Sequence, residues 1–211
     1  MTKTPVDQLI GHFDRVLRTT AGTLSATSRP LPGKDLPTMS LTDEERTESA
    51  RLMRVNHCGE VCAQALYQGQ ALTSRSAHTR KAMEKAATEE EDHLYWCQER
   101  LKSLDSHVSY LNPLFYAASF ATGAITGLMG DRINLGFVAA TEAQVCRHLD
   151  EHIEKLPADD AQSREILEEM RRDEKHHENT AMELGGAHFP SPVQRVMTLM
   201  SRAMTRTTYW I

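Results

Sequence analysis

The chain has 211 residues, of which 40% are hydrophobic and 25% are charged, and its formal net charge at pH 7 is -5. This length fits one domain with a sizeable buried core, and the composition fits an all-α soluble class. The acidic balance argues against nucleic acid as the main partner. The four cysteines form no Cys-x-x-Cys pair, so we expect reduced thiols in a cytosolic protein. Asp7 and Asp14, without an apolar run, argue against a signal or transit peptide.

Residues 1–40 predict an N-terminal amphipathic helix followed by a linker. The apolar residues of the segment 5–19 share one helical face, which fits a helix docked on the main domain or one that touches a membrane surface. Residues 20–40 contain Pro30, Pro32, Gly33 and Pro37, which are typical of a linker. The main domain is therefore expected at 41–211.

Four long helical segments are expected in this domain. The first covers residues 43–74 and begins with acidic residues in its first turn; the second covers 77–105. The third begins with Asp131 as its N-cap and ends before Pro157. The fourth covers 159–184 and stops at Gly185-Gly186. Four such segments predict a four-helix bundle.

Between the second and third segments, residues 108–130 carry no charge. Their number would permit a membrane span, but they are rich in Ala, Gly, Ser and Thr. Two other structures fit this segment. One is a buried helix with close packing at Gly123-x-x-x-Gly127, and the other is an interfacial helix that touches lipid.

A last amphipathic helix is expected at 191–206. Its apolar stripe consists of Val193, Val196, Met197, Met200 and Met204, and Arg195, Arg202 and Arg206 lie opposite. The basic face and the terminal Tyr209-Trp210 suit an anionic lipid surface. A helix that caps the bundle fits the same pattern.

Two Glu-x-x-His pairs carry the chemistry of the chain. Glu90 and His93 are three residues apart, so both project from one helical face. Glu174 and His177 repeat the pair. A single Glu lies upstream of each pair, Glu60 by 30 residues and Glu142 by 32 residues.

One Glu-x-x-His is weak evidence, because charged helices often contain it on a solvated face. Two pairs with matched upstream Glu residues predict a dinuclear carboxylate site inside a four-helix bundle. Four carboxylates and two imidazoles neutralise two divalent ions, with iron, manganese or a mixed pair all acceptable. The uncharged segment separates the two halves of this site in sequence, so it is not expected to cross a membrane. If the assumed helical register were wrong, neighbouring acids or histidines would be the ligands instead. These neighbours are Glu89, Glu91, Asp173, His176 and Glu178.

These motifs resemble the Coq7 family over residues 45–211. The matching segments are Arg54-Val-Asn-His-Cys-Gly-Glu60, Ala65-Leu-Tyr67-x-Gly69-Gln70, Glu90-x-x-His93-x-x-Trp96, Thr141-Glu142 and Asp173-Glu174-x-x-His177. The resemblance implies a ferritin-like di-iron monooxygenase that hydroxylates the ring of demethoxyubiquinone in ubiquinone synthesis. It implies two iron ions per chain, held by Glu60, Glu90, His93, Glu142, Glu174 and His177. By the same resemblance, Arg54, Tyr67 and His148 match positions associated with substrate or electron delivery.

The expected partners follow from this chemistry. The substrates would be a polyprenyl quinone and O2, and the absence of a Gly-rich dinucleotide or flavin motif in the sequence predicts an external reductant or reduction through the quinone. A polyprenyl tail predicts peripheral contact with the cytoplasmic side of the cell membrane, by a homo-oligomer or within a quinone-synthesis complex. Three rivals stay open: an iron-storage or peroxide-scavenging protein, a tRNA-modifying di-iron hydroxylase, and a lipid-binding bundle with a vestigial site.

Overall fold

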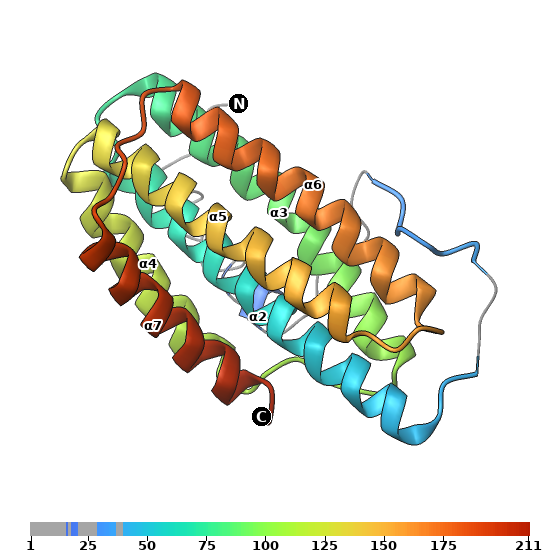
Figure 1. The fold of residues 1–211 in the computed structure, drawn as a ribbon. Coiled ribbons are helices and arrows are strands. Elements are labelled where there is room, and N and C mark those ends of the chain that lie inside the picture. The colour runs from blue at the N-terminus through green and yellow to red at the C-terminus, as the bar shows by residue number, and fades with distance from the viewer. Residues whose placement is uncertain (1–15, 17, 21–28, 37–39) are drawn as a thin grey trace.

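A computed structural model describes residues 16, 18–20, 29–36 and 40–211 of the chain. Six α-helices have both ends within these residues, residues 16 and 18–20 are helical as well, and no β-strand occurs among the described residues, which confirms the predicted all-α fold. The helices are α2 (Asp43–Thr73), α3 (Ala77–Ser103), α4 (Asn112–Leu128), α5 (Asp131–Lys155), α6 (Ala161–Glu183) and α7 (Ser191–Thr208) (Figure 1). The predicted bounds of the four bundle helices differ from these by at most two residues at either end.

The bundle consists of α2, α3, α5 and α6, with α2 packed on α3 and α5 packed on α6. Of the three clusters of buried apolar side chains, two lie toward opposite ends of these helices. The first contains Leu52, Met53, Trp96, Leu101, Leu149, Ile166, Leu167 and Met170. The second contains Ala63, Tyr67, Met83, Ala86, Ala87, Leu135, Val138, Ala139 and Ala181. The middle of each bundle helix lies between the two clusters, and this is where the predicted ligands stand.

Capping side chains set where the helices begin. Thr42 and Glu45 form a capping box at the start of α2, and Asp160 accepts a hydrogen bond from the Ser163 N–H at the start of α6. The prediction that Asp131 caps α5 was wrong. The N-cap is Gly130, whose φ of 104° is a conformation that glycine adopts without strain, and Asp131 instead accepts a hydrogen bond from Ser74 at 3.1 Å.

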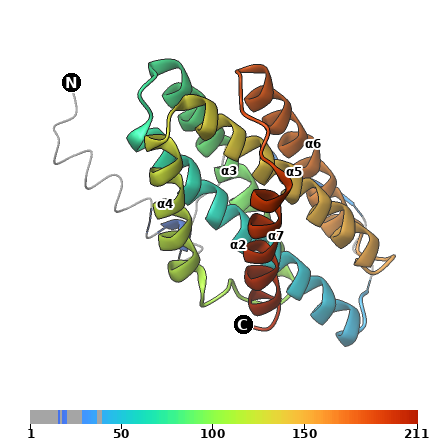
Figure 2. The ribbon, with the colours of Figure 1, turned by 60° about the vertical axis from the view of Figure 1, so that its left-hand side comes forward.

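The uncharged segment forms α4, which lies along α2 on the outside of the bundle (Figure 2). The approach is close: a Cβ added at Gly123 would lie 2.2 Å from the Leu66 carbonyl oxygen, and one added at Gly69 would lie 2.3 Å from that of Phe120. The predicted packing through Gly123 is therefore confirmed. The opposite side of the helix exposes Leu114, Ile125, Leu128 and Met129. Among the described residues, no helix is long and apolar enough to cross a bilayer.

Most of the predicted N-terminal helix at 5–19 lies outside the described residues. Of the N-terminal segment, Val16 packs against the cluster of Val61, Ala65, Leu94 and Tyr116, and Leu31 packs against the apolar cluster around Trp96. The described part of the linker, 29–36, therefore contacts the bundle. The division of the chain at residue 40 stays a prediction.

Candidate metal centre

The four bundle helices each contribute to one buried polar cluster. Glu60 comes from α2, Glu90 and His93 from α3, Glu142 from α5, and Glu174 and His177 from α6. None of these six residues is more than 7% exposed. The three-residue spacing within each Glu-x-x-His pair directs both side chains inward, as predicted. The structure thus brings all six candidate ligands together.

The cluster divides into two groups of potential ligands. The first is Glu60, Glu90, His93 and Glu174, and the second is Glu90, Glu142, Glu174 and His177. Within each group the candidate donor atoms all lie within 4.8 Å of one another. Because Glu90 and Glu174 belong to both groups, their carboxylates can bridge two metal ions.

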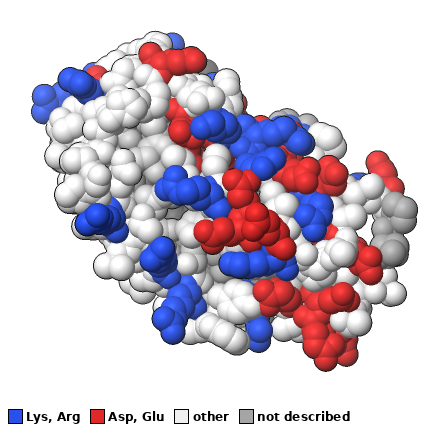
Figure 3. Space-filling model, viewed as in Figure 1, with Lys and Arg blue, Asp and Glu red and all other residues white. Residues whose placement is uncertain are grey.

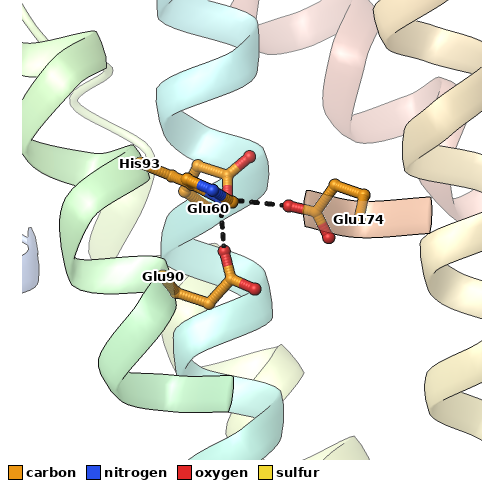
Figure 4. A group of neighbouring side chains, drawn as sticks. All are labelled: Glu60, Glu90, His93 and Glu174. Carbon is orange, nitrogen blue, oxygen red and sulfur yellow. Dashed lines mark hydrogen bonds and ion pairs between the residues drawn. The ribbon is translucent and has the colours of Figure 1, made fainter. Parts of the chain in front are cut away.

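Both histidines present Nδ1 to the shared carboxylates. Nδ1 of His93 is 3.0 Å from Glu90 Oε2, 3.1 Å from Glu174 Oε1 and 3.5 Å from Glu60 Oε2 (Figure 4). Nδ1 of His177 is 3.4 Å from Glu90 Oε1 and 3.5 Å from Glu174 Oε2. Each half of the cluster therefore has one imidazole, one terminal carboxylate and the two shared ones.

Several atoms of this cluster lack the partners that buried polar atoms normally have. One oxygen of Glu90, one of Glu142, both of Glu174 and Nδ1 of His177 make no hydrogen bond to the described residues. Leaving such atoms unpaired in a protein interior is costly, and bound cations would satisfy them. Carboxylate and imidazole donors in this number fit two divalent metal ions.

The electrostatics of the cluster also favour bound cations. Burial and the nearby Glu90 raise the pKa of Glu60 well above its ordinary value, and burial and Glu174 do the same to the pKa of Glu142. Burial opposes the charged imidazole of His177, but the carboxylates of Glu174 and Glu90 raise its pKa to about 12. Without metal, the cluster therefore binds protons to offset its negative charge. Divalent ions would take the place of these protons.

A second layer of carboxylates orients the histidines. Nε2 of His93 donates to Asp173 Oδ2 at 2.9 Å, and Nε2 of His177 donates to Glu89 Oε2 at 2.9 Å. Such hydrogen bonds leave Nδ1 free for a metal and fix the ring. The pairing is crossed between the two motifs. Asp173 directly precedes Glu174 but binds His93, and Glu89 directly precedes Glu90 but binds His177. Sequence reasoning treated Asp173 and Glu89 only as register alternatives. Their place before each Glu-x-x-His was the signal available.

The three further residues matched by resemblance lie in different places. Tyr67 is fully buried, and its hydroxyl donates to Glu142. Arg54 donates to the carbonyl oxygens of His107 and Tyr209 and to the Ser106 hydroxyl, and thus ties α2 to the loop after α3 and to the C-terminus. His148 faces α7 and is 2.8 Å from the Ser201 hydroxyl. The structure brings Tyr67 to the cluster but not Arg54 or His148, whose part in substrate or electron delivery stays a prediction.

We expect Tyr67→Phe to weaken metal binding and to slow turnover by about 10-fold each. This is the lower end of the loss that usually follows when a hydrogen-bond partner of a metal ligand is removed. The substitution keeps the ring in the core and removes only the hydrogen bond to Glu142. Metal per chain and product formed per minute would be measured together. Tyr110→Phe, at an exposed position, is the control. Equal metal binding and turnover in both variants would contradict this role of Tyr67.

A small pocket of about 80 Å³ reaches the cluster from the surface between α3 and α6. Its walls are mostly apolar, with Met83, Ala86 and Val138 among them, and it also touches Tyr67 and His177. A cavity that holds benzene measures about 150 Å³. This pocket therefore has room for a diatomic gas beside the cluster.

The fold and the cluster together define a class: ferritin-like helical bundles with a buried centre of four carboxylates and two histidines. Comparison with known proteins specifies the family. A family model described as "Ubiquinone biosynthesis protein COQ7" matches residues 47–208. The chain belongs to the COQ7 family, and the resemblance expected from its motifs is confirmed.

The relatives share one description. A protein of Chromohalobacter salexigens named "3-demethoxyubiquinol 3-hydroxylase" is 57% identical over 203 residues, which are 96% of this chain and 95% of the relative. A protein of Ectopseudomonas mendocina with the same name is 56% identical over 207 residues, 98% of this chain and 96% of the relative. One from Pseudomonas fluorescens, also so named, is 53% identical over 207 residues, with the same coverage. The similarity thus extends over nearly the whole chain.

Proposed function

We propose that this chain is a 3-demethoxyubiquinol 3-hydroxylase, a monooxygenase of ubiquinone synthesis that uses two iron ions at the buried centre. Relatives of that name match the chain over almost its full length. The observation that carries the proposal is the cluster itself, in which Glu90 and Glu174 serve two groups of ligands. We assign the metal to Glu60, Glu90, His93, Glu142, Glu174 and His177.

The chemistry explains why such a site is needed. An aromatic C–H bond is too inert for a side-chain acid or base, and two bound iron ions would supply the activation of O2 that ring hydroxylation requires. The protein's own part is to hold the ions and keep bulk water away. The two apolar clusters, one toward each end of the bundle, exclude water from the centre. Asp173 and Glu89 orient the two histidines, and Tyr67 holds Glu142.

The small pocket beside Tyr67 and His177 suits the entry of O2. An apolar wall favours a nonpolar gas, and the volume of about 80 Å³ is more than a diatomic molecule needs. The two electrons needed for turnover would come from an external reductant or through the quinone, since the sequence has no Gly-rich dinucleotide motif.

We further propose that α4 and α7 place the protein on the cytoplasmic surface of the cell membrane. The outer face of α7 exposes Val193, Val196, Leu199 and Met200, and α4 exposes Ile125 and Leu128. The helix α7 contains three Arg and no acidic residue. Where α7 lies in Figure 3, the surface is white and blue, while the acidic residues gather farther to the right. An amphipathic helix that has exposed apolar side chains and only basic charges favours anionic lipid.

Replacing Val196, Leu199 and Met200 together with serine is expected to remove most binding to anionic liposomes. Each side chain is large, apolar and exposed, so burying it in the interface is what stabilises the bound state. Flotation with lipid would measure the bound fraction. A second variant replaces Arg195, Arg202 and Arg206 with glutamine and so removes only the charge. We expect it to lose binding to anionic liposomes and to bind neutral liposomes as the wild type does. Unchanged flotation of the serine variant would remove α7 from the proposed surface.

The function is tested by metal content and turnover on protein purified without oxygen. Iron would be counted per chain, and a demethoxyubiquinol and a reductant would then be supplied under air. Two irons and a ring-hydroxylated product would support the proposal. Two irons with only peroxide decay or iron oxidation would favour a scavenging or storage protein. A chain without stoichiometric metal would overturn the assignment of the centre.

A further inference from the structure

Arg29 lies in the linker before the bundle, yet it binds directly to α6. Its Nη1 donates to Asp173 Oδ2 at 2.5 Å, and its Nη2 donates to Glu169 Oε1 at 2.5 Å. Its guanidinium group also lies over the ring of Trp96, 4.7 Å from the ring centroid. The same segment is anchored two residues later, where Leu31 packs on the apolar cluster that contains Trp96. Arg29 is thus a fixed cation with two carboxylates and one aromatic ring as partners.

Two of these partners touch His93. Asp173 accepts the hydrogen bond from Nε2 of His93 at 2.9 Å. The Trp96 ring packs beside the imidazole at a centroid distance of 5.4 Å. These two contacts orient the imidazole from the side away from the shared carboxylates, and Arg29 contacts both groups that make them.

The other half of the centre is held differently. The carboxylate that orients His177 is Glu89, and its ion pair is with Lys85 of the same helix, at 2.9 Å. The Lys85 side chain is 71% exposed, and exposed pairs four residues apart on a helix contribute little. The sequence repeats the Glu-x-x-His motif, but only the His93 half has a cation brought to it from a separate segment of the described chain.

We propose that Arg29 is a positioning residue for the His93 half of the metal centre. It holds Asp173 and Trp96 so that Nδ1 of His93 faces the shared carboxylates. This inference rests on the metal centre of the proposed function.

The physical basis is the shape and permanent charge of arginine. The guanidinium group stays charged at all relevant pH values, and its planar fork can bind two carboxylates at once. The Asp173 side chain is 24% exposed, so without Arg29 it could turn toward water. His93 would then lose the hydrogen bond that directs its ring, and changes of this kind typically weaken metal binding by about 10–100-fold. The metal held by Glu142 and His177 should be nearly unaffected.

The test is a metal titration of the Arg29→Gln variant, which keeps polar atoms and removes the charge. Metal-free protein would be titrated anaerobically with Fe2+, and with Co2+, whose visible absorption reports its ligands. We expect one of the two dissociation constants to rise by about 10-fold or more and the other to change little. Arg29→Lys keeps the charge but reaches only one carboxylate at a time, so we expect a smaller rise.

Repeating the Arg29→Gln substitution in two variants that each lack one histidine assigns the effect to one half of the centre. In His177→Ala, which keeps the His93 half, Arg29→Gln should weaken the remaining metal as it does in the parent. In His93→Ala it should have no further effect, because residues that act through one group are not additive. An equal loss in both backgrounds would show a general structural role and would overturn the inference.

Arg172→Gln is the matched control. Arg172 also pairs with Glu169, but it makes no contact with Asp173 among those the structure describes. It should bind both metals as the wild type does. Wild-type constants in Arg29→Gln would refute the positioning role, while a wild-type chain that binds no metal would instead refute the proposed function. Circular dichroism of the metal-free proteins would show whether each variant is folded. If Arg29→Gln is not folded, the metal titration of Arg29→Lys decides whether Arg29 positions His93.

Discussion

Replacing Glu174 with alanine is expected to remove both metal ions and to lower hydroxylation by more than about 100-fold, beyond the usual loss from an outer hydrogen bond. Glu174 belongs to both groups of ligands, and both of its oxygens lack a hydrogen-bond partner among the described residues. Its loss therefore affects both ions, whereas Glu60→Ala should spare the ion held by Glu142 and His177. Elemental analysis would give metal per chain, and mass spectrometry would give the hydroxylated product.

Glu178→Ala is the control for this experiment. Glu178 lies one turn after Glu174 on α6 but pairs with Lys175 at 2.8 Å, away from the cluster. We expect wild-type metal content and turnover from it. Circular dichroism of the metal-free Glu174→Ala protein would show whether it is folded, because the substitution also removes the carboxylate that lies beside Nδ1 of His93 and of His177. Retention of both ions by Glu174→Ala would show that Glu174 is not a shared ligand.

The helices and the inward-facing residues could be predicted because local spacing determines them. Apolar periodicity and turn signals such as Gly185-Gly186 mark the ends of the bundle helices within two residues. The three-residue spacing of Glu90 and His93 places both on one face of α3, whatever the rest of the chain does. Repetition of the pair then indicated how the two halves would meet.

Contacts between distant segments could not be predicted in this way. The hydrogen bond from His93 to Asp173 joins residues 80 positions apart, and that from Arg29 to Asp173 joins residues 144 positions apart. No periodicity within one helix encodes such a pairing. Arg54 and His148 show the same limit: the family motif marked them, but their partners lie in the loop after α3, at the C-terminus and on α7.

The uncharged segment has one packed face and one exposed apolar face, and contact of the exposed face with lipid stays a prediction. Close packing at Gly123 and lipid contact were alternatives in the sequence, yet α4 packs on α2 through its glycines and exposes Leu114 and Ile125 on the other side. Composition alone cannot separate these faces, because small and large apolar residues are equally uncharged. The arrangement of α4 against α2 therefore determines whether its apolar face is presented outward as a surface.

Glycines 59 and 69, both on α2, offer a direct test of that arrangement. Nothing lies within 4 Å of a Cβ added at Gly59, whereas one added at Gly69 would lie 2.3 Å from the Phe120 carbonyl oxygen and 2.8 Å from the Ala124 nitrogen. Both of the latter atoms belong to the backbone of α4, so no side-chain rotation can relieve the clash. The helix α4 would have to move away from α2.

We expect Gly69→Ala to lower the free energy of unfolding by about 1–3 kcal/mol, the usual cost of forcing extra atoms into a packed interface. Gly59→Ala should instead raise it by about 0.5–1 kcal/mol, since alanine favours the helix over glycine. Urea denaturation followed by circular dichroism would measure both values under the same metal loading. Because the intrinsic gain in helix propensity is common to both variants, their difference isolates the contact with α4. Equal stabilisation in the two variants would mean that α4 does not lie this close to α2 in solution.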